Sequence, residues 1–575
     1  MSAEAHQRRV VRRPVAATVL AADGVTPLLA RLYGARGVTS AEELSLGLER
    51  LVPVGTLPGV EAAAALLARH RAGRVLIVGD FDADGATASA LMVRVLRRYG
   101  FASVDFLVPD RFRLGYGLSP GVVVEAEKRA PSLLVTVDNG VSSIDGVAAA
   151  RAAGLEVLIT DHHLPGAVLP EATVHVNPNL PGSGFASRAL AGVGVAFYVL
   201  AALGRLLGRP TGELSDYLDL VALGTVADVV PLDRNNRILV EQGLRRVRAG
   251  RAVPGLRALC AVARRPLDRL VASDLGFFVG PRLNAAGRLT DMSIGIECLL
   301  ADDDTRALEL ATELDRLNTE RREIESKMQA EAERIIVGLR FDAEGATLPA
   351  GLCLYDAGWH QGVVGLVASR IKDRVHRPVV AFAPGDDGAL RGSARSVPGV
   401  HVRDALEAVS TAVPGLIDRF GGHAMAAGLT LGAGRVREFA DLFAAEVARR
   451  AEPGMLQGTW LTDGELGAAE LTLETAATLR AAGPWGSGFP EPCFDGRFSV
   501  LEAREVGDGH LKCVVRHGRA APPLDAIAFG WLKRSGRALP RPGTVAELVY
   551  RLDVNEYQGV RRLQLLVDEF TPAAG

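Results

Sequence analysis

The sequence is poor in several residue types, and each shortage excludes a class of protein. Only five of its 575 residues are cysteines, and no two of them form a CxxC pair. This scarcity argues against a disulfide framework and against a zinc site built from thiolates, and it is typical of a reducing compartment. Aromatic residues make up only 5% of the chain, so most of them are expected in the core.

Long apolar runs and an excess of one charge are also missing. The longest uncharged run, residues 189–204, has 16 residues and is interrupted by glycines, which is short of the ~20 residues of a membrane-spanning helix. The N-terminus lacks the apolar region of a secretory signal, so we expect a cytoplasmic protein with no membrane partner. With 65 basic and 67 acidic residues the net charge is −2, so any surface for nucleic acid must be local.

Among what is present, residues 74–90 (RVLIVGDFDADGATASA) stand out. They begin with an apolar run that is typical of a strand buried on both faces. Asp80, Asp82 and Asp84 follow, and a helical pattern extends over residues 86–99. Three like charges so close together repel each other, and a divalent cation between them would relieve the repulsion. This stretch therefore predicts half of a metal site.

The other half is expected at the ends of later strands. Strand and helix patterns alternate between about residues 55 and 240, which predicts a mostly parallel sheet with helices on both faces. Such sheets bind ligands beyond the carboxyl ends of their strands, so polar clusters there should converge. The clusters that follow predicted strands, or lie near a helix end, are Asp138, the run Asp161, His162 and His163, and Asp228.

Taken singly, each of these residues has an ordinary structural explanation. Asp82 or Asp84 would be a helix cap, Asp138 a turn residue, and His162 and His163 two surface imidazoles. Taken together, oxygen ligands and imidazoles without a thiolate favour Mn²⁺ or Mg²⁺ over a structural zinc. The number of acids is enough for two ions ~3.5–4 Å apart, as in phosphoryl-transfer hydrolases.

The pattern changes after this first α/β region. Residues 302–339 have apolar positions three, four or seven apart, with charges between them, which predicts one long amphipathic helix that connects two domains. A second α/β unit follows, and the last part has short strands with glycine and proline turns that suit a small β-barrel. The predicted segments are an N-terminal segment (1–50), a parallel-sheet domain (51–301), the connector helix (302–339), a second α/β domain (340–455) and the barrel (456–575).

Several segments resemble the motifs of one family in order and spacing. VGDFDADGATA, TVDNG, TDHH and GTVADVVPL resemble the four motifs of the DHH phosphoesterase superfamily. WHQGVVGLVASRIKDR, RGSARS and FGGHAMAAG resemble its DHHA1 companion domain. RLNAAGRL, the connector helix and a C-terminal oligonucleotide-binding (OB) barrel narrow the resemblance to the RecJ family of bacterial exonucleases, over about residues 50–575.

The resemblance implies an activity and a set of metal ligands. The activity is that of a single-stranded-DNA-specific exonuclease, which hydrolyses phosphodiester bonds in the 5′→3′ direction with two metal ions and releases 5′-mononucleotides in DNA recombination and repair. The implied ligands of two Mn²⁺ or Mg²⁺ ions are Asp80, Asp82, Asp84, Asp138, His162 and Asp228. Asp138 would bridge the ions, His163 would contact phosphate or support the ligands, and Asp80 would bind directly or through water.

Substrate contacts are expected outside the metal site. Arg111 follows a predicted strand and would either reach the mouth of the site or be an ordinary solvated arginine. The other candidates for contacts with phosphate or with the site are Arg282, Asn284, Arg288, Ser393, Arg395, Gly421, Gly422 and His423. The last three would present backbone N–H groups or simply form a tight turn. Aromatic residues that would stack on bases, or belong to the core, are Trp485, Phe489, Trp531 and Tyr557.

Two alternatives stay open. A hydrolase of short oligonucleotides, cyclic dinucleotides or pyrophosphate would share the superfamily motifs, but such relatives are typically shorter and lack the barrel. A catalytically silent scaffold that binds single strands would not need the complete acid and histidine set. Single-strand specificity would come from a channel between the two α/β domains that is too narrow for duplex, with the long helix fixing its width. We also expect a monomer that is assisted by a helicase and a single-stranded-DNA-binding protein.

Overall fold

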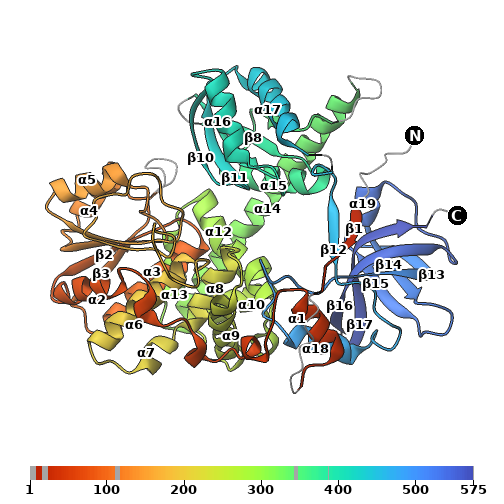
Figure 1. Ribbon diagram of the computed structural model, residues 1–575, viewed down its shortest axis with the longest axis horizontal. Helices are drawn as coiled ribbons and strands as arrows, with labels where there is room; N and C mark the ends of the chain where they lie inside the picture. Colours follow the sequence, from red (N-terminus) through yellow and green to blue (C-terminus); the bar gives the residue numbers. More distant parts are fainter. Residues whose placement is uncertain are drawn as a thin grey trace.

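The helices and strands of the computed structural model form three bodies, two of which share one long helix (Figure 1). We call them the parallel-sheet body, the mixed-sheet body and the barrel. All five cysteines are free, as expected for a chain without a disulfide framework. The structure describes residues 8–15, 24–109, 117–341, 348–385, 388–452, 454–557 and 559–573.

The parallel-sheet body is built on five strands in the order β3-β2-β4-β5-β6, all parallel. The central strand β4 is buried at every residue, which is the pattern of a strand covered on both faces. The expected parallel sheet is therefore confirmed. Its strands are β2 (Arg74–Gly79), β3 (Ser103–Leu107), β4 (Leu133–Val137), β5 (Glu156–Thr160) and β6 (Val174–Val176).

Helices cover both faces of this sheet. Alternate residues of β2 point to opposite sides: Leu76 and Val78 pack with α4 (Pro120–Glu127) and α5 (Ile144–Ala152), whereas Ile77 belongs to the larger core on the other side. This alternation follows from the period of two in a strand. The helices that contribute to the larger core include α2 (Val60–Arg69), α3 (Ala83–Arg98) and α6 (Gly192–Leu206).

The rest of the parallel-sheet body is helical. Helix α8 is apolar and packs against α3, α6 and α9. The π-helical turn η5 leads directly into α12, so the two form one helical segment. The bounds are η1 (Ala41–Leu44), η2 (Leu48–Arg50), η3 (Val54–Thr56), α7 (Thr211–Ser215), α8 (Leu218–Ala227), α9 (Arg234–Arg248), α10 (Pro254–Val262), η4 (Leu267–Arg269), α11 (Ala272–Asp274), η5 (Leu275–Val279), α12 (Gly280–Leu289) and α13 (Ser293–Leu300).

The predicted connector is one helix, α14 (Asp304–Phe341), of 38 residues. At 1.5 Å per residue it is about 57 Å long. Leu310 and Leu314 in its first half belong to the core of the parallel-sheet body, whereas Met328 and Ala332 belong to a core with α15 of the mixed-sheet body. The helix therefore contributes to two cores and connects the two bodies.

The mixed-sheet body has the strand order β10-β11-β9-β8-β7, with β7 and β8 parallel and the other pairs antiparallel. The first five residues of RGSARS lie in β9, and Ser396 follows the strand. The bounds are β7 (Leu352–Tyr355), α15 (Val364–Val375), β8 (Val379–Pro384), β9 (Leu390–Arg395), α16 (Val402–Ala412), β10 (Ile417–Gly422), β11 (Ala426–Leu431) and α17 (Val436–Arg450).

The C-terminal body is a closed barrel in the order β13-β14-β15-β17-β16, as the short strands predicted. Closure comes from the parallel pairing of β15 with β17, while the other neighbours are antiparallel. The bounds in this part of the chain are β12 (Thr459–Thr462), α18 (Leu473–Ala481), β13 (Phe494–Val506), β14 (His510–Arg516), β15 (Leu524–Ala528), α19 (Trp531–Ser535), β16 (Val545–Tyr557) and β17 (Val560–Pro572).

Of the two alternatives for the aromatic residues of this region, the structure supports a place in the core for those that it describes. Phe489 and Trp531 are buried, and the Trp531 indole donates to a backbone carbonyl within the barrel. The rings of Trp485, Tyr33 and Phe489 pack against one another, with 5.2 to 6.3 Å between centroids. These rings are core residues because each is covered by its neighbours. The side chain of Tyr557 lies outside the described residues.

The N-terminal residues are joined to the C-terminal part of the chain. Strand β1 (Arg9–Arg12) pairs in parallel with β12, and Tyr33 comes from α1 (Pro27–Gly34). Arg13 and Arg36 form ion pairs with the buried Asp463, at 3.1 and 3.0 Å. The first segment therefore helps to hold the barrel against the rest of the molecule.

Within the described ranges, no single helix is long and apolar enough to cross a membrane. One bent pair of helical segments, Leu48–Thr56 with Val60–Arg69, passes the test by length and composition only. The second member of that pair is α2, which packs against α6 and β6 in the parallel-sheet body.

Candidate active site

The candidate site lies at the carboxyl ends of the central strands of the parallel sheet. Asp80 follows β2, Asp138 follows β4, and Asp161 follows β5. The last residues of these three strands are paired in register, so the aspartates one residue further on lie side by side. The structure thus brings together side chains that are about 80 residues apart in the sequence, as expected for a parallel sheet.

Helix α3 begins at Ala83, three residues earlier than the sequence pattern predicts. The Asp82 side chain accepts a hydrogen bond from the Gly85 N–H at 3.0 Å and caps the helix. The Asn284 side-chain oxygen accepts another from the Ala83 N–H at 2.7 Å. These two acceptors satisfy donors that a helix N-terminus leaves open. As a result, Asp84 lies in the first helical turn.

Asp84 is buried, and backbone groups hold both of its carboxylate oxygens. Oδ2 accepts from the Gly192 N–H at 2.6 Å and Oδ1 from the Val193 N–H at 2.9 Å, both in the first turn of α6. Burial, reinforced by the charge of Asp82, raises the pKa of Asp84 to about 7, although the two N–H groups oppose the shift. Gly192 also leaves room for Asp138, since a Cβ there would lie 2.5 Å from the Cβ of Asp138.

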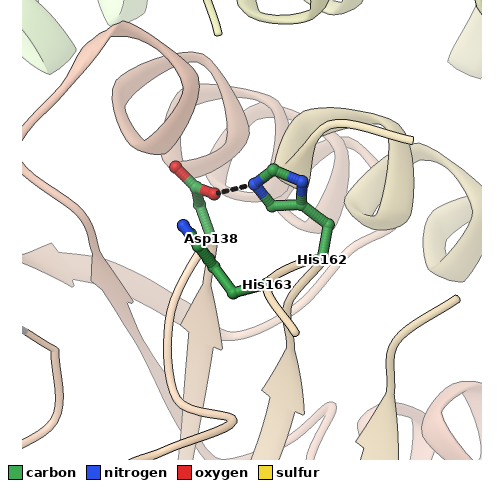
Figure 2. Close-up of side chains that lie close together, drawn as sticks. All are labelled: Asp138, His162 and His163. Carbon is green, nitrogen blue, oxygen red and sulfur yellow. Dashed lines mark ion pairs between the residues drawn. The ribbon is translucent and has the colours of Figure 1, made fainter. Parts of the chain in front are cut away.

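Asp138, His162 and Asp228 meet at the centre of the site. His162 Nε2 lies 3.0 Å from Asp138 Oδ1 (Figure 2) and 3.5 Å from Asp228 Oδ2. Asp138 has a left-handed backbone conformation, with φ 61°, which is uncommon outside glycine. Burial raises the pKa of Asp138 and of Asp228, and the charge of Asp84 adds to both shifts. Burial lowers the pKa of His162 to about 4.

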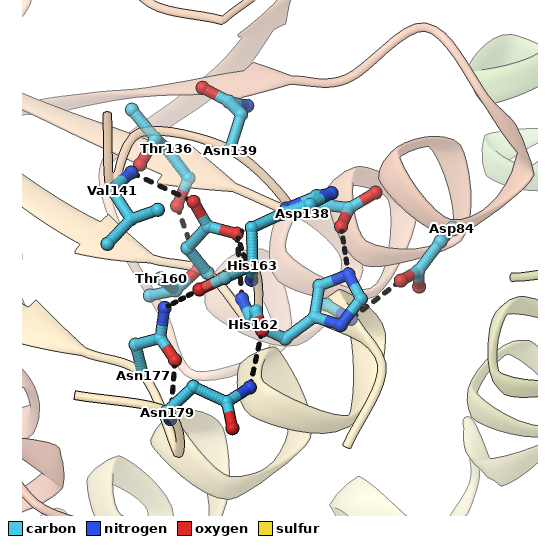
Figure 3. A network of polar contacts seen from close by, with 12 residues as sticks. Asp84, Thr136, Asp138, Asn139, Val141, Thr160, His162, His163, Asn177 and Asn179 are labelled. Atoms are coloured by element: carbon cyan, nitrogen blue, oxygen red, sulfur yellow. Dashed lines mark hydrogen bonds and ion pairs between the residues drawn. The ribbon is translucent and has the colours of Figure 1, made fainter. Parts of the chain in front are cut away.

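Asp161 organises the imidazoles of the DHH segment. Its buried carboxylate lies 2.8 Å from His163 Nδ1 and accepts hydrogen bonds from the N–H groups of His162 and Val141 (Figure 3). Although burial favours the protonated acid, the hydrogen bond and charge of His163 lower the pKa of Asp161. Burial likewise opposes a charge on His163, but Asp161 raises its pKa to about 9. The contact with Asp161 therefore favours the charged form of His163.

These side chains form three overlapping groups, in each of which the ligand atoms lie within 4.8 Å of one another. Carboxylate and imidazole ligands suit Mn²⁺ or Mg²⁺. The raised pKa values of Asp84, Asp138 and Asp228 indicate negative charge that the protein alone leaves poorly compensated, and a divalent cation would compensate it. The donor set therefore fits such ions. The groups are Asp84 with His162 and Asp228, Asp80 with Asp82 and Asp138, and Asp138 with His162 and His163.

Three predicted substrate residues lie on α12, beside this cluster. Asn284 supports the start of α3 as described above. Arg288 donates to the Gly362 carbonyl of the mixed-sheet body at 3.3 Å. Arg282 forms an ion pair of 2.7 Å with Asp315 on α14, so its charge is already compensated within the protein. The helix thus contacts the acidic segment, the connector and the mixed-sheet body.

Ser393 and Arg395 lie together on β9 of the mixed-sheet body. Arg395 Nη1 donates to Ser393 Oγ at 2.9 Å. A Cβ on Gly365, in the first turn of α15, would lie 2.8 Å from Arg395 Nη2 and 3.0 Å from Ser393 Oγ. Both polar groups are therefore next to the N-terminal turn of a helix, where an anion is favoured.

The hairpin between β10 and β11 places His423 beside the cluster of acids and imidazoles. The rings of His423 and His163 are stacked, with 6.5 Å between their centroids. Gly421 and Gly422 end β10, and Gly422 has φ 142° with the Ala426 carbonyl only 2.4 Å from where a Cβ would be. The prediction that the His423 N–H is available to phosphate is wrong, because it donates to Ala426 O at 2.7 Å.

Some residues of the site fall outside the sequence-based expectations. The Asn177 and Asn179 side chains donate to the carbonyls of His163 and His162, at 2.9 and 2.6 Å (Figure 3). In the sequence, only the position of these two residues indicates a role in the site, because both follow the short strand β6 of the same sheet. Arg111 lies outside the described residues.

Family models match three separate parts of the chain. The DHH family N-terminal domain matches residues 74–225, the DHHA1 domain 348–449 and the RecJ OB domain 462–569. These ranges lie in the parallel-sheet body, the mixed-sheet body and the barrel. The fold and the acidic site therefore define a protein of the DHH class with a DHHA1 companion domain.

Comparisons of nearly the whole chain with known proteins and structures identify its family within this class. The chain is 52% identical to the "Single-stranded-DNA-specific exonuclease RecJ" of Dickeya dadantii, over 98% of each chain. A crystal structure of RecJ in complex with Mn²⁺ from Thermus thermophilus matches with a TM-score of 0.80 at 30% identity, over 99% of this chain and 80% of that one. For its complex with Mg²⁺ the TM-score is 0.73 at 28% identity, over 99% and 78%. The chain belongs to the RecJ family.

Proposed function

We propose that this chain is a metal-dependent exonuclease that degrades single-stranded DNA in the 5′→3′ direction and releases 5′-mononucleotides, in DNA recombination and repair. The observation that carries the proposal is the convergence of acids and imidazoles at one edge of the parallel sheet, opposite polar groups of the mixed-sheet body. The related RecJ proteins are named for this substrate. The barrel, which matches an OB model, supports a polymer as substrate over a dinucleotide.

Two ions, Mn²⁺ or Mg²⁺, are the proposed cofactors. Asp84, His162 and Asp228 would hold one, and Asp80, Asp82 and Asp138 the other. Asp138 would bridge them, because it belongs to the second group and also lies 3.0 Å from His162. When bound, the ions supply a water of lowered pKa and neutralise charge on the reacting phosphate.

The protein's own groups orient the substrate. His163, charged through its contact with Asp161, would donate a hydrogen bond to a nonbridging phosphate oxygen. Hydrolysis breaks the bond between phosphorus and the 3′ oxygen of the terminal nucleotide, and the phosphate stays on the shortened strand. Each cycle therefore leaves a new 5′-phosphate.

The direction of degradation would follow from recognition of that 5′-phosphate. Ser393 and Arg395 are the proposed contacts, because they lie together next to the first turn of α15 in the mixed-sheet body. Arg288 would contribute from α12, where it already touches the mixed-sheet body. A terminal phosphate carries an extra negative charge relative to an internal one, so cationic groups there select chain ends.

The test is a time course on a long single-stranded DNA labelled at either end, with Mn²⁺, Mg²⁺ or a chelator. We expect early release of the label from the 5′ end, only with metal. Asp84→Ala should abolish cleavage and spare DNA binding. Internal fragments at early times, or a duplex end degraded as fast as a single strand, would contradict the proposal.

Other properties belong to the same proposal. A cytoplasmic monomer would meet single strands produced by a helicase and covered by a single-stranded-DNA-binding protein. Activity on helicase-unwound duplex, measured with and without each partner, tests these assignments. A loss of 5′ release with either partner would contradict them.

A further inference from the structure

An aromatic side chain is strongly exposed on the helical segment that borders the candidate site. Phe277, in η5, is 77% exposed, the highest fraction among the large apolar side chains that the structure describes as exposed. The next residue, Phe278, differs in being covered by the Arg265 guanidinium, 3.4 Å from its ring centroid. A single exposed apolar side chain is ordinary by itself, but this ring lies on the helical segment that also carries Asn284 and Arg288 of the candidate site.

Phe277 lies on one face of this segment with two residues of the site. At helical spacing, Phe277, Pro281, Asn284 and Arg288 are four, three and four residues apart, and none of them is buried. Asn284 contacts the start of α3, and Arg288 contacts the mixed-sheet body. Phe277 precedes Asn284 by seven residues, which is about two helical turns. This face therefore extends from the cluster of acids and imidazoles to the Phe277 ring.

The backbone next to Phe277 packs closely against α8, the helix that ends at Asp228. A Cβ on Gly276 would lie 3.2 Å from Val226, and a Cβ on Gly280 would lie 3.1 Å from Ala227. Both contacts are at the C-terminal end of α8, where Asp228 is the cap. Glycines at these two positions allow the close approach. The π-helical turn, a feature frequent at functional sites, therefore has a fixed place relative to the site.

We propose that Phe277 is a stacking platform for a base of single-stranded DNA on the 3′ side of the scissile phosphate. This inference depends on the proposed function. The Arg288 end of the face touches the body that would hold the 5′-phosphate, so the Phe277 end points along the rest of the strand. A phenyl ring binds any base through its face, which suits an enzyme without sequence preference.

The test is a length series of 5′-phosphorylated oligodeoxynucleotides from 2 to 20 nucleotides, with Kd measured in Ca²⁺ and KM in Mn²⁺. Wild-type affinity should rise in a step at the length whose base reaches the ring. Phe277→Ala should remove that step and weaken binding of the 20-mer by about 5- to 100-fold, the range for losing one base–aromatic stack. Phe277→Trp should restore it, and dinucleotide hydrolysis should be unchanged in both variants.

A matched control is Leu206→Ala, which removes another exposed apolar side chain, 55% exposed at the end of α6. It should leave the length series unchanged. A 2-aminopurine at the position of the step should lose its quenching in Phe277→Ala only. If wild type degrades single strands but Phe277→Ala matches it at every length, the platform is refuted while the proposed function stands. If wild type neither binds nor degrades single strands, both are refuted.

Discussion

The two sides of the candidate site differ in burial and in charge. On the parallel-sheet side the side chains are buried acids, such as Asp84 and Asp138, held by backbone groups at the ends of strands and helices. On the mixed-sheet side they are donors, such as Arg395 and the exposed His423, on a strand and a hairpin. In the proposed function the two sides therefore have different roles. The parallel-sheet side would bind metal, and the mixed-sheet side would position the DNA.

Asp84 and Glu446, one acid from each body, have pKa values that are shifted in opposite directions. Burial raises the pKa of Asp84 to about 7, with the charge of Asp82 adding to the shift. Glu446 on α17 of the mixed-sheet body has a pKa lowered to about 2 by hydrogen bonds from Arg449 and then Arg450, which outweigh partial burial. Among the described residues no Lys or Arg forms an ion pair with Asp84, so a bound cation would compensate its charge.

The largest effect is expected from Asp138→Asn, which keeps the shape of the side chain and removes its charge. Metal ions contribute several kcal/mol to catalysis, so we expect the single-turnover rate to fall by roughly 10³-fold or more. Asp302→Asn is the control, since that carboxylate is 89% exposed. Near-normal cleavage by Asp138→Asn would contradict a metal-binding role for the parallel-sheet side of the site.

Arg395→Ala tests the other side. A hydrogen bond to a charged group contributes about 1.5–3 kcal/mol, so KM for a 5′-phosphorylated strand should rise by roughly 10- to 100-fold. A strand with a 5′-hydroxyl should show little change, because the lost contact is to the phosphate. Arg435→Ala, on the exposed start of α17, serves as the control. An equal effect on both substrates would argue against an end-phosphate site.

Asn284→Ala should have a smaller effect on the metal side. It removes the acceptor for the Ala83 N–H and loosens the turn that carries Asp82 and Asp84. Supporting residues of this kind typically change metal affinity by about 10- to 100-fold, and we expect the lower end. The half-saturating Mn²⁺ concentration reports it, and excess Mn²⁺ should restore the rate. A lost rate that Mn²⁺ does not restore would place Asn284 in contact with DNA instead.

The smallest effect concerns stability. Glu446→Gln should lower the free energy of unfolding by less than about 1 kcal/mol at pH 7, since its ion pairs are near the surface. The pKa of Glu446 is depressed in the folded state, so its contribution is present above the ordinary carboxyl pKa and is lost as the pH falls towards about 2. Urea unfolding at pH 7 and pH 3 should show the difference shrinking. A constant difference would assign the effect to packing.

Local patterns were sufficient for the elements that are buried or strongly periodic. The strands that end at the site and the long helix α14 were predicted within a few residues, because hydrophobic periodicity reports burial directly. The start of α3 was placed too late. Its first turn depends on the Asp82 cap and on Asn284, which is about 200 residues further along the chain.

The aromatic residues show why exposure was harder to predict. Trp485 and Phe489 appeared available for bases but pack with Tyr33 of α1, and no local pattern indicates a partner more than 400 residues away. Phe277 was not singled out at all, since a phenylalanine in an apolar segment most often belongs to the core. Only the packing of η5 on α8 leaves its ring outside.

The sequence alone determined the kind of chemistry, because acids and histidines at the ends of predicted parallel strands must converge. Tertiary structure alone decided how those groups are charged. Asp84 lies between two helix starts, Asp161 favours the charged form of His163, and His423 reaches the cluster from another body. Burial and the distances between charges set these properties, and both depend on contacts between residues far apart in the chain.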